Sequence, residues 1–240
     1  MIRLIALLVM LVVSVQAQFC ALPVPLLGAW TPRGYNPSLW LRGDDNLVDS
    51  SVNNVTMKLV GTPQYAPGIN ASALEFMQLG AWYFQFTNFP TVVKNESVVS
   101  VCFWIYPYPN TSVRYHIFGN RSPDGSGHWQ IEYDQGTATN NIAMSGPGTW
   151  VAVTGDNTVP YLTWTHVAFV KKGNGADDTL VYLNGVPATL IAHAAYTISP
   201  TETVFQFNRT AKTDATLDDF LVFDHELSSN DVVRIYNWRD

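Results

Sequence analysis

Charged residues are scarce in this 240-residue chain, where they make up 13% of the sequence, against about 25% in typical soluble domains. The 13 lysines and arginines form no basic run, and the formal net charge is −6. A mildly acidic chain without a basic patch suits neither nucleic acid nor an anionic membrane surface. We therefore expect no partner of either kind.

Long hydrophobic runs are confined to the N-terminus. Residues 4–15 are apolar apart from Ser14, they follow Arg3, and Ala17 completes a small-residue cleavage site. This pattern predicts a secretory signal peptide at 1–17, because the run is too short to span a bilayer comfortably. No later segment is apolar enough to cross a membrane, and no hydrophobic tail suggests a lipid anchor. We expect a secreted protein, located outside the cell or on a cell or virion surface.

Cysteine is nearly absent, since the chain has two, Cys20 and Cys102. In an oxidising compartment they can bridge within the chain, which would tie the N-terminal segment to a core strand. The alternative is a buried free thiol at Cys102, with Cys20 pairing between chains. We favour the intramolecular disulfide.

Sites for N-linked glycans are numerous, although charged residues are few. Six Asn-X-Ser/Thr sequons lie at Asn54, Asn70, Asn95, Asn110, Asn120 and Asn208. Behind a signal peptide, this number indicates a glycosylated protein of a eukaryote or of a eukaryotic virus. The alternative is an exported bacterial protein that is simply rich in Asn and Thr.

Turn residues punctuate the mature chain without a linker-like stretch, which indicates one domain. Residues 18–37 are rich in proline and predict an irregular lead-in, so the domain is placed at 38–240. Short β-branched and aromatic runs at regular spacing predict an all-β antiparallel sandwich. The expected strands are 39–41, 57–60, 73–76, 82–86, 97–106, 115–120, 129–133, 141–144, 150–154, 164–171, 179–183, 186–191, 204–208 and 217–223.

Two local motifs predict definite conformations. The pair Asn184 and Gly185 joins two apolar runs, and it predicts a type I′ hairpin turn, which needs two positive φ angles. Ser228, with Asp231 three residues on, has the pattern of a helix capping box. The residues that follow supply an apolar face and predict one short C-terminal helix: Val232, Val233, Ile235 and Tyr236.

Four segments together resemble the laminin-G-like, concanavalin A-like (pentraxin-like) jelly-roll domains. They are 38–44 with 47–51, 98–107 (VVSVCFWIYP), 164–185 (similar to a W-x-H-V-A … L-Y-x-N-G hairpin) and 217–236 (LDDFLVFDHELSSNDVVRIY). The chain departs from the family pattern at Val52, where glycine is expected, and at Asp231, where glutamate is usual. The resemblance implies two packed antiparallel sheets, one of them concave. The strand in 98–106 is apolar on both faces, so we expect it to be central.

A calcium site is implied by the same resemblance, because related domains often hold one Ca²⁺ near the first turn and the closing strand. Ca²⁺ takes about six to eight oxygen ligands, and the matching segments offer Asp49, Asn53 and Asp218, with Asn54 and Asp219 as substitutes. Asp218 and Asp219 are expected on opposite faces of a strand, so one of them joins a given site. The alternative is that Asp49 caps a turn and the closing-strand aspartate pairs with a backbone amide or an arginine.

Catalytic patterns are incomplete. Related sandwich enzymes hydrolyse glucans with a Glu-x-Asp-x-x-Glu strand, whose carboxylates share one face. Glu132 and Asp134 begin that pattern, but Thr137 stands where the second glutamate is needed, and both acids are interpreted as solvent-facing. No histidine lies beside a Gly-x-Ser-x-Gly turn. We expect no catalytic residues and a protein that is not an enzyme.

Aromatic residues make up 13% of the chain, with eight tryptophans. Most belong to the core, while a few exposed rings would stack on sugars. The candidate ligand-binding residues are Trp104, Tyr106, Tyr108 and Trp129. The sequence predicts a secreted, non-catalytic module that binds an extracellular ligand, either glycan or protein, with glycan favoured. The alternatives are a structural or interaction subunit of an extracellular or virion-surface assembly, and a glycan-active hydrolase.

Overall fold

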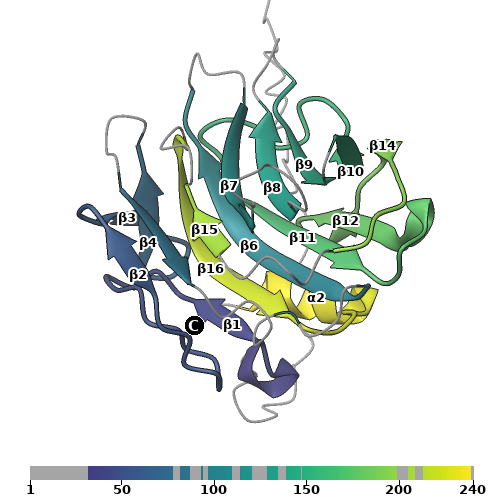
Figure 1. Ribbon diagram of the computed structural model, residues 1–240. Coiled ribbons are helices and arrows are strands. Elements are labelled where there is room, and N and C mark those ends of the chain that lie inside the picture. Colours follow the sequence, from purple (N-terminus) through teal and green to yellow (C-terminus); the bar gives the residue numbers. More distant parts are fainter. Residues whose placement is uncertain are drawn as a thin grey trace, which may run out of the picture. The chain divides into compact units, whose positions relative to one another are not determined.

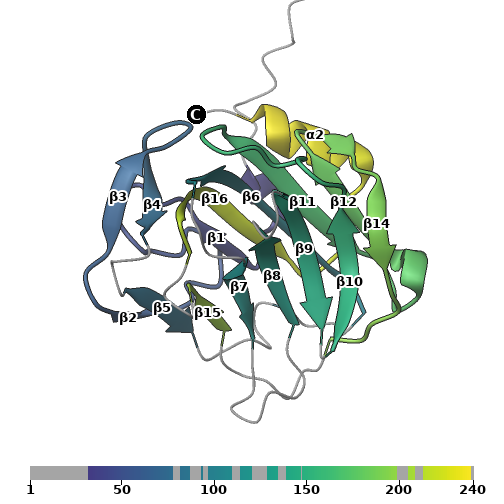
Figure 2. The same cartoon turned by 90° about the horizontal axis from the view of Figure 1, so that it is seen from above.

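The computed structural model describes residues 32–77, 82–86, 93, 97–109, 114–120, 129–134, 139–146, 148–198, 205–208 and 213–238. The predicted signal peptide at 1–17, most of the lead-in, Cys20, Asn95 and Asn110 lie outside these residues. In the described part of the chain, two antiparallel sheets face each other and one α-helix follows the last strand (Figures 1 and 2). The predicted all-β sandwich with a short C-terminal helix is confirmed.

Sheet A contains the strand that was expected to be central. Its strands, in spatial order, are β13 (Val186–Pro187), β12 (Thr179–Leu183), β11 (Thr165–Lys171), β6 (Val99–Pro107), β16 (Ala215–Phe223), β4 (Ser72–Phe76) and β3 (Gln64–Pro67), and β1 (Leu39–Leu41) also pairs with β16. β6 hydrogen-bonds to β11 on one side and to β16 on the other. The prediction of a central strand is therefore confirmed.

Sheet B lies opposite sheet A and is, like sheet A, eight-stranded in the described part of the chain. In spatial order its strands are β14 (Leu190–His193), β10 (Thr149–Thr154), β9 (Asn141–Gly146), β8 (Trp129–Asp134), β7 (Arg114–Asn120), β15 (Phe205–Phe207), β5 (Tyr83–Phe86) and β2 (Lys58–Val60). Figure 2 shows these strands side by side in this order. The strand pairings among the described residues are antiparallel, for example β8 with β9.

Aromatic rings fill the space between the two sheets. Phe84 of β5 stacks on Phe207 of β15 with ring centroids 4.3 Å apart, and Phe118 of β7 lies 4.7 Å from Phe220 of β16. All four side chains are at most 1% exposed. Burial of one such side chain contributes about 1.5–3 kcal/mol, so this aromatic layer is a main source of stability.

Two strand predictions differ from the structure. The run 186–191 was expected to be one strand, but it divides into β13 in sheet A and β14 in sheet B, because the chain changes sheets between Pro187 and Leu190. β3 was not predicted at all. It is an edge strand that ends at Pro67, and proline, which cannot donate to a ladder, is tolerated at such an edge.

The turn and helix motifs adopt the predicted conformations. Asn184 and Gly185 have φ angles of 51° and 78°, as a type I′ turn requires. Helix α2 (Ser229–Asn237) begins after Ser228, whose hydroxyl accepts from the Asp231 N–H while the Asp231 carboxylate accepts from the Ser228 N–H. Val233, predicted on the apolar face, is 39% exposed instead.

Helix α2 covers part of the outer face of sheet A. The Tyr236 ring lies 5.6 Å from Trp104 of β6 and 5.8 Å from His166 of β11. This contact explains why β6 is apolar on both faces, since one face meets the core and the other meets the helix. No helix among the described residues has the length and hydrophobicity needed to cross a membrane.

Candidate functional site

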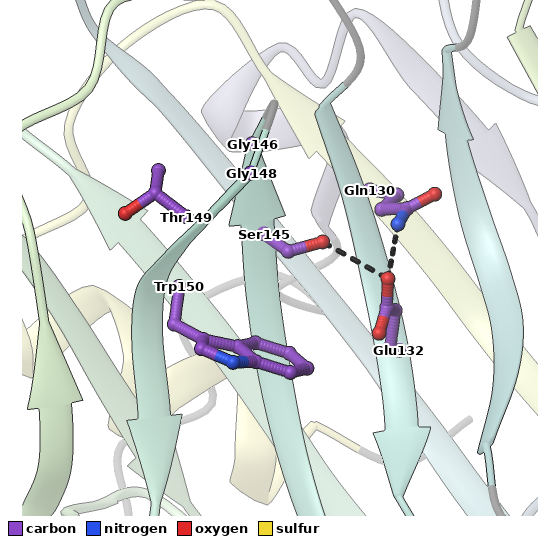
Figure 3. A pocket seen from close by; sticks show the side chains of 7 residues that line it. All are labelled: Gln130, Glu132, Ser145, Gly146, Gly148, Thr149 and Trp150. Atoms are coloured by element: carbon purple, nitrogen blue, oxygen red, sulfur yellow. Dashed lines mark hydrogen bonds between the residues drawn. The ribbon is translucent and has the colours of Figure 1, made fainter. Parts of the chain in front are cut away.

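A pocket opens on the outer face of sheet B, which is the face turned away from the core (Figure 3). Its volume is about 250 Å³, and three neighbouring strands supply its walls. Glu132 and Gln130 come from β8, Ser145 from β9, and Thr149 and Trp150 from β10. The pocket is thus built on regular strands, which hold side chains more rigidly than loops do.

Strand alternation explains why polar side chains gather here. In β8, Ile131 and Tyr133 belong to the core. Because side chains alternate along a strand, Gln130 and Glu132 point to the opposite face. The register then places Gln130 opposite Ser145. Ser145 in turn lies opposite Trp150, so the three strands contribute to one site.

Glu132 is the centre of the pocket. It is 2% exposed, and its Oε1 accepts hydrogen bonds from the Ser145 hydroxyl at 2.9 Å and from the Gln130 side-chain amide. Nδ1 of His116, on β7, lies 3.4 Å from the same oxygen. A buried carboxylate is costly unless it is hydrogen-bonded, and these neighbours meet that need at Oε1. The expectation that Glu132 faces solvent is wrong, because the pocket walls enclose it.

Trp150 gives the pocket an aromatic wall. Its indole is directed from β10 across β9 toward Glu132 (Figure 3), and the side chain is partly exposed. An apolar ring face beside a hydrogen-bonded carboxylate is complementary to a sugar, which has apolar C–H faces and hydroxyl donors. The sequence did not single out Trp150 as a ligand-binding residue.

Glycine is required at the rim of the pocket, where β9 turns into β10. Gly148 has a φ of +65°, in the left-handed region that favours glycine. A Cβ on Gly146 would collide with the ring of Tyr196, which packs against this backbone. Burial raises the pKa of the Tyr196 hydroxyl to about 12, so the ring stays uncharged at neutral pH.

Two of the predicted ligand-binding residues are not exposed. Trp129 is 0% exposed and lies in the core, with its ring 5.7 Å from Phe118. Trp104 is 5% exposed and lies beneath Tyr236 of helix α2. Both predictions are wrong, because one face of each strand is covered by the opposite sheet or by the helix.

The other two predicted ligand-binding residues, Tyr106 and Tyr108, lie together, but at the end of β6 in sheet A. Their rings are 5.5 Å apart, and Tyr106 is also 5.5 Å from Trp164. All three side chains are partly exposed. The Tyr108 hydroxyl donates to Glu75 at 3.0 Å, which fixes its position. This second aromatic group is separate from the Glu132 pocket, and its role in binding remains a prediction.

The predicted calcium ligands hold the backbone together instead of facing an open cation site. The Asp49 carboxylate accepts from four donors at 2.7–2.9 Å: the N–H groups of Trp40, Ser51 and Val55 and the Ser51 hydroxyl. The Asn53 amide donates to the Ser38 carbonyl at 2.8 Å. Donors directed at a carboxylate repel a cation, so these residues do not fit Ca²⁺. Among the described residues, no group of three or more His, Cys, Asp or Glu is arranged to hold a metal.

Asp218 and Asp219 lie on the same side of β16 rather than on opposite faces as predicted. The register with β6 shifts between Asp218 and Leu221, and Asp219 has a φ of 45°, so a bulge breaks the alternation. Asp218 accepts from the Ile69 N–H at 2.7 Å, while Asp219 accepts from the Asn70 side chain at 3.5 Å. Burial raises the pKa of Asp218 to about 6.

The described sequons differ in exposure. Asn54 and Asn70 are exposed, and Asn120 lies in β7. Asn208 is 0% exposed, and its amide donates to the Trp82 carbonyl at 2.8 Å. Because a glycan would be attached to that buried nitrogen, the folded structure contradicts the prediction of glycosylation at Asn208.

Cys102 is fully buried in β6, and burial raises the pKa of its thiol. A thiol of this kind is chemically unreactive in the folded protein. Its predicted partner, Cys20, lies outside the described residues, so the disulfide stays a prediction.

A family model described as the Concanavalin A-like lectin/glucanases superfamily matches residues 80–233. The chain belongs to this superfamily. The matched region begins before β5 and ends within α2, so it includes every strand that lines the pocket. No curated protein matches the chain.

Solved structures of other proteins share the fold of this chain. One of them is domain 4 of AbnA, a GH43 extracellular arabinanase from Geobacillus stearothermophilus, in complex with arabinotriose. This domain is 21% identical to the chain, and the TM-score is 0.65 over 84% of this chain and 98% of that domain. A structure of botulinum neurotoxin type C, whose cell entry depends on interaction with two ganglioside molecules, is 18% identical. Its TM-score is 0.67 over 86% of this chain and 52% of that chain. The botulinum neurotoxin DC binding domain, in complex with rat synaptotagmin II, is 18% identical with a TM-score of 0.64, covering 84% and 51%. The chain spans about half the length of these toxin chains.

Proposed function

We propose that this protein is a secreted, non-catalytic module that binds a glycan in the Glu132 pocket. The observation that carries the proposal is the pairing of a partly exposed Trp150 ring with the hydrogen-bonded carboxylate of Glu132 on one open sheet face. The ring offers a surface for the C–H face of a sugar. The carboxylate, the Ser145 hydroxyl and the Gln130 amide offer acceptors and donors for its hydroxyls.

The comparisons support a binding role. The arabinanase domain was solved in complex with arabinotriose, and botulinum neurotoxin type C depends on gangliosides for cell entry. The other toxin domain was solved in complex with a protein, synaptotagmin II. These relatives are extracellular or toxin binding domains, in agreement with the predicted signal peptide. A pocket with polar groups on rigid strands favours a glycan over a flat protein surface as the ligand of this chain.

The number of carboxyl groups in the pocket supports a role without catalysis. Glycosidases place two carboxyl groups on either side of the scissile bond. Among the described residues that line the pocket, Glu132 is the one carboxylate. We therefore assign Glu132 to ligand binding.

A glycan array with the full chain tests the proposal. We expect binding of one glycan class, and Trp150→Ala should weaken it by about tenfold or more, as for an aromatic hot spot. Trp164→Ala, which removes a partly exposed tryptophan from sheet A, is the matched control and should bind normally. Loss of binding in Trp164→Ala alone would move the site to the Tyr106 group. An array without any signal would favour a structural or interaction subunit.

A hydrolase is the second candidate, because Glu132 is buried beside His116 in a pocket and not solvent-facing. Asp134 lies two residues further along β8, on the same face of the strand. Incubation of the glycan hits with wild type and Glu132→Gln decides between the two roles. We expect intact glycans with both proteins; cleavage by wild type that Glu132→Gln abolishes would establish an enzyme.

A further inference from the structure

Sheet B carries a continuous line of in-register residues on its outer face, which we call the polar row. From one edge of the sheet toward the other, these residues are Lys58, Gln85, Gln206, Gly119, Gln130, Ser145 and Trp150. Each belongs to a different strand, and each pair of neighbours is a direct cross-strand partner. Figure 2 shows the strands that carry them, β2 to β10, lying side by side.

The residues of the polar row share the face that holds the pocket. Gln85 lies between the core residues Phe84 and Phe86, and Gln206 lies between Phe205 and Phe207, which are also in the core. Their side chains therefore point away from the core, like that of Gln130 in β8. The polar row thus leads from the sheet edge directly into the pocket.

Exposure falls along the polar row from Lys58 to Ser145 and rises again at Trp150. Lys58 at the edge is exposed, and Gln85 and Gln206 are partly exposed. Gln130 and Ser145, at the pocket, are 9% and 6% exposed. Side chains near the edge are available to a ligand, while those at the pocket are recessed and held by Glu132.

Gly119 lies in the middle of the polar row and is buried. Its strand comes so close to β8 that a Cβ would collide with the backbone of Trp129 and Gln130. Glycine is therefore required for this strand pairing, which follows a register shift between His116 and Phe118. As a consequence, β7 adds no side chain to the row, and Gln130 and the Trp129 backbone lie next to Gly119.

The chemistry of the polar row suits a long uncharged chain of sugars. Three of its seven positions are glutamines, whose amides both donate to and accept from hydroxyl groups. Strands in a sheet lie about 4.8 Å apart, so the six steps from Lys58 to Trp150 span about 29 Å. A single sugar would fill the pocket and leave the glutamines of β5 and β15 without contact.

We propose that the polar row is an extended binding site for a linear, neutral oligosaccharide that crosses the strands of sheet B with one end in the Glu132 pocket. This inference rests on the proposed function, because it assumes that the pocket takes a sugar. It adds the class of ligand, a linear chain of several residues, and the direction in which that chain lies.

Titration calorimetry with oligosaccharides of increasing length tests the inference. The probes are linear α-1,5-arabino-oligosaccharides and β-1,4-gluco-oligosaccharides, each from the disaccharide to the octasaccharide. For one series, we expect the affinity to rise with length up to a chain that reaches β5. Gln206→Ala and Gln85→Ala should each weaken the longest chains by about three- to tenfold, the value of one net hydrogen bond, and leave the disaccharide unaffected. Gln64→Ala, an exposed glutamine on β3 of sheet A, is the matched control.

The outcomes separate this inference from the proposed function. A length-dependent gain that Gln206→Ala and Gln85→Ala remove, and Gln64→Ala does not, supports the extended site. Equal affinity for short and long chains, with loss of binding in Trp150→Ala, overturns the extended site and leaves the pocket intact. Binding of branched glycans alone on the array also overturns it. If neither the array nor the oligosaccharides show binding, both the inference and the proposed function fail.

Discussion

The Ser145 hydroxyl donates a 2.9 Å hydrogen bond to Oε1 of Glu132, which joins β9 to β8 at the centre of the pocket. Both side chains are more than nine-tenths buried. The bond therefore holds the carboxylate in one position and partly offsets the cost of burying it.

Removing this hydroxyl should destabilise the protein and weaken binding together. We expect Ser145→Ala to lower the free energy of unfolding by about 1.5–3 kcal/mol, because the bond is made to a charged group. Urea unfolding followed by tryptophan fluorescence measures the change. Ser229→Ala, which removes a bond between two uncharged hydroxyls at 2.9 Å, should cost about 0.5–1.5 kcal/mol. Equal losses in the two variants would contradict a special role for the carboxylate contact.

Stability should depend on pH through Asp218. Burial raises the pKa of its carboxyl from 3.8 to about 6 in the folded state, so the folded protein binds a proton more readily than the unfolded chain. Its protonation then favours the folded state fully below pH 3.8, and that contribution is lost as the pH rises through 6. Relative to Asp218→Asn, wild type should gain up to about 3 kcal/mol as the pH falls from about 7 to about 4, at about 1.4 kcal/mol per pKa unit.

Chemical denaturation of both proteins across this pH range measures the difference. A pair of parallel curves would show that Asp218 has an ordinary pKa. Asp231, whose pKa is lowered by its helix-cap contacts with Ser228, contributes in the opposite direction in both proteins and so cancels in the comparison.

Calcium should have no effect on stability. The four donors around Asp49 already occupy its carboxylate, so we expect the same melting temperature in EDTA and in excess Ca²⁺. Asp49→Ala should lower the free energy of unfolding by about 3 kcal/mol or more, since three backbone N–H groups lose their acceptor. A melting temperature that rises with Ca²⁺ in wild type and not in Asp49→Ala would restore the calcium hypothesis.

Glycan occupancy should follow the exposure of each asparagine. In protein secreted from eukaryotic cells, we expect glycans at Asn54 and Asn70 and none at Asn208, whose amide is committed to the Trp82 carbonyl. Mass spectrometry of glycopeptides before and after glycosidase treatment measures the occupancy of each site. A glycan at Asn208 would show that this segment folds differently from the structure described above.

Local sequence motifs predicted the structure well where it depends on interactions between adjacent residues. Asn184-Gly185 and the Ser228 capping box adopt their predicted conformations because a turn and a helix start depend on a few adjacent residues. The division of 186–191 between two sheets was missed, since an apolar run fits either sheet and only tertiary packing decides.

The site was harder to predict because it depends on which face of a strand is covered. Trp129 and Glu132 differ in parity within β8, so one enters the core and the other enters the pocket. The sequence offered a signal for this: Gln130, Glu132 and Asp134 alternate with apolar residues, which marks the outer face. Trp150 joins them through register with β9, and no single-strand pattern contains that information.

The change of sheets between Pro187 and Leu190 also affects how this molecule meets other copies of itself. It leaves β13, at one edge of sheet A, with only two residues, and the opposite edge strand, β3, ends in a proline. Such edges present too few free backbone N–H and C=O groups for a neighbouring chain to add a strand. These two edges of sheet A are therefore poor templates for edge-to-edge aggregation, which matters for a protein with so few charged residues to keep its copies apart.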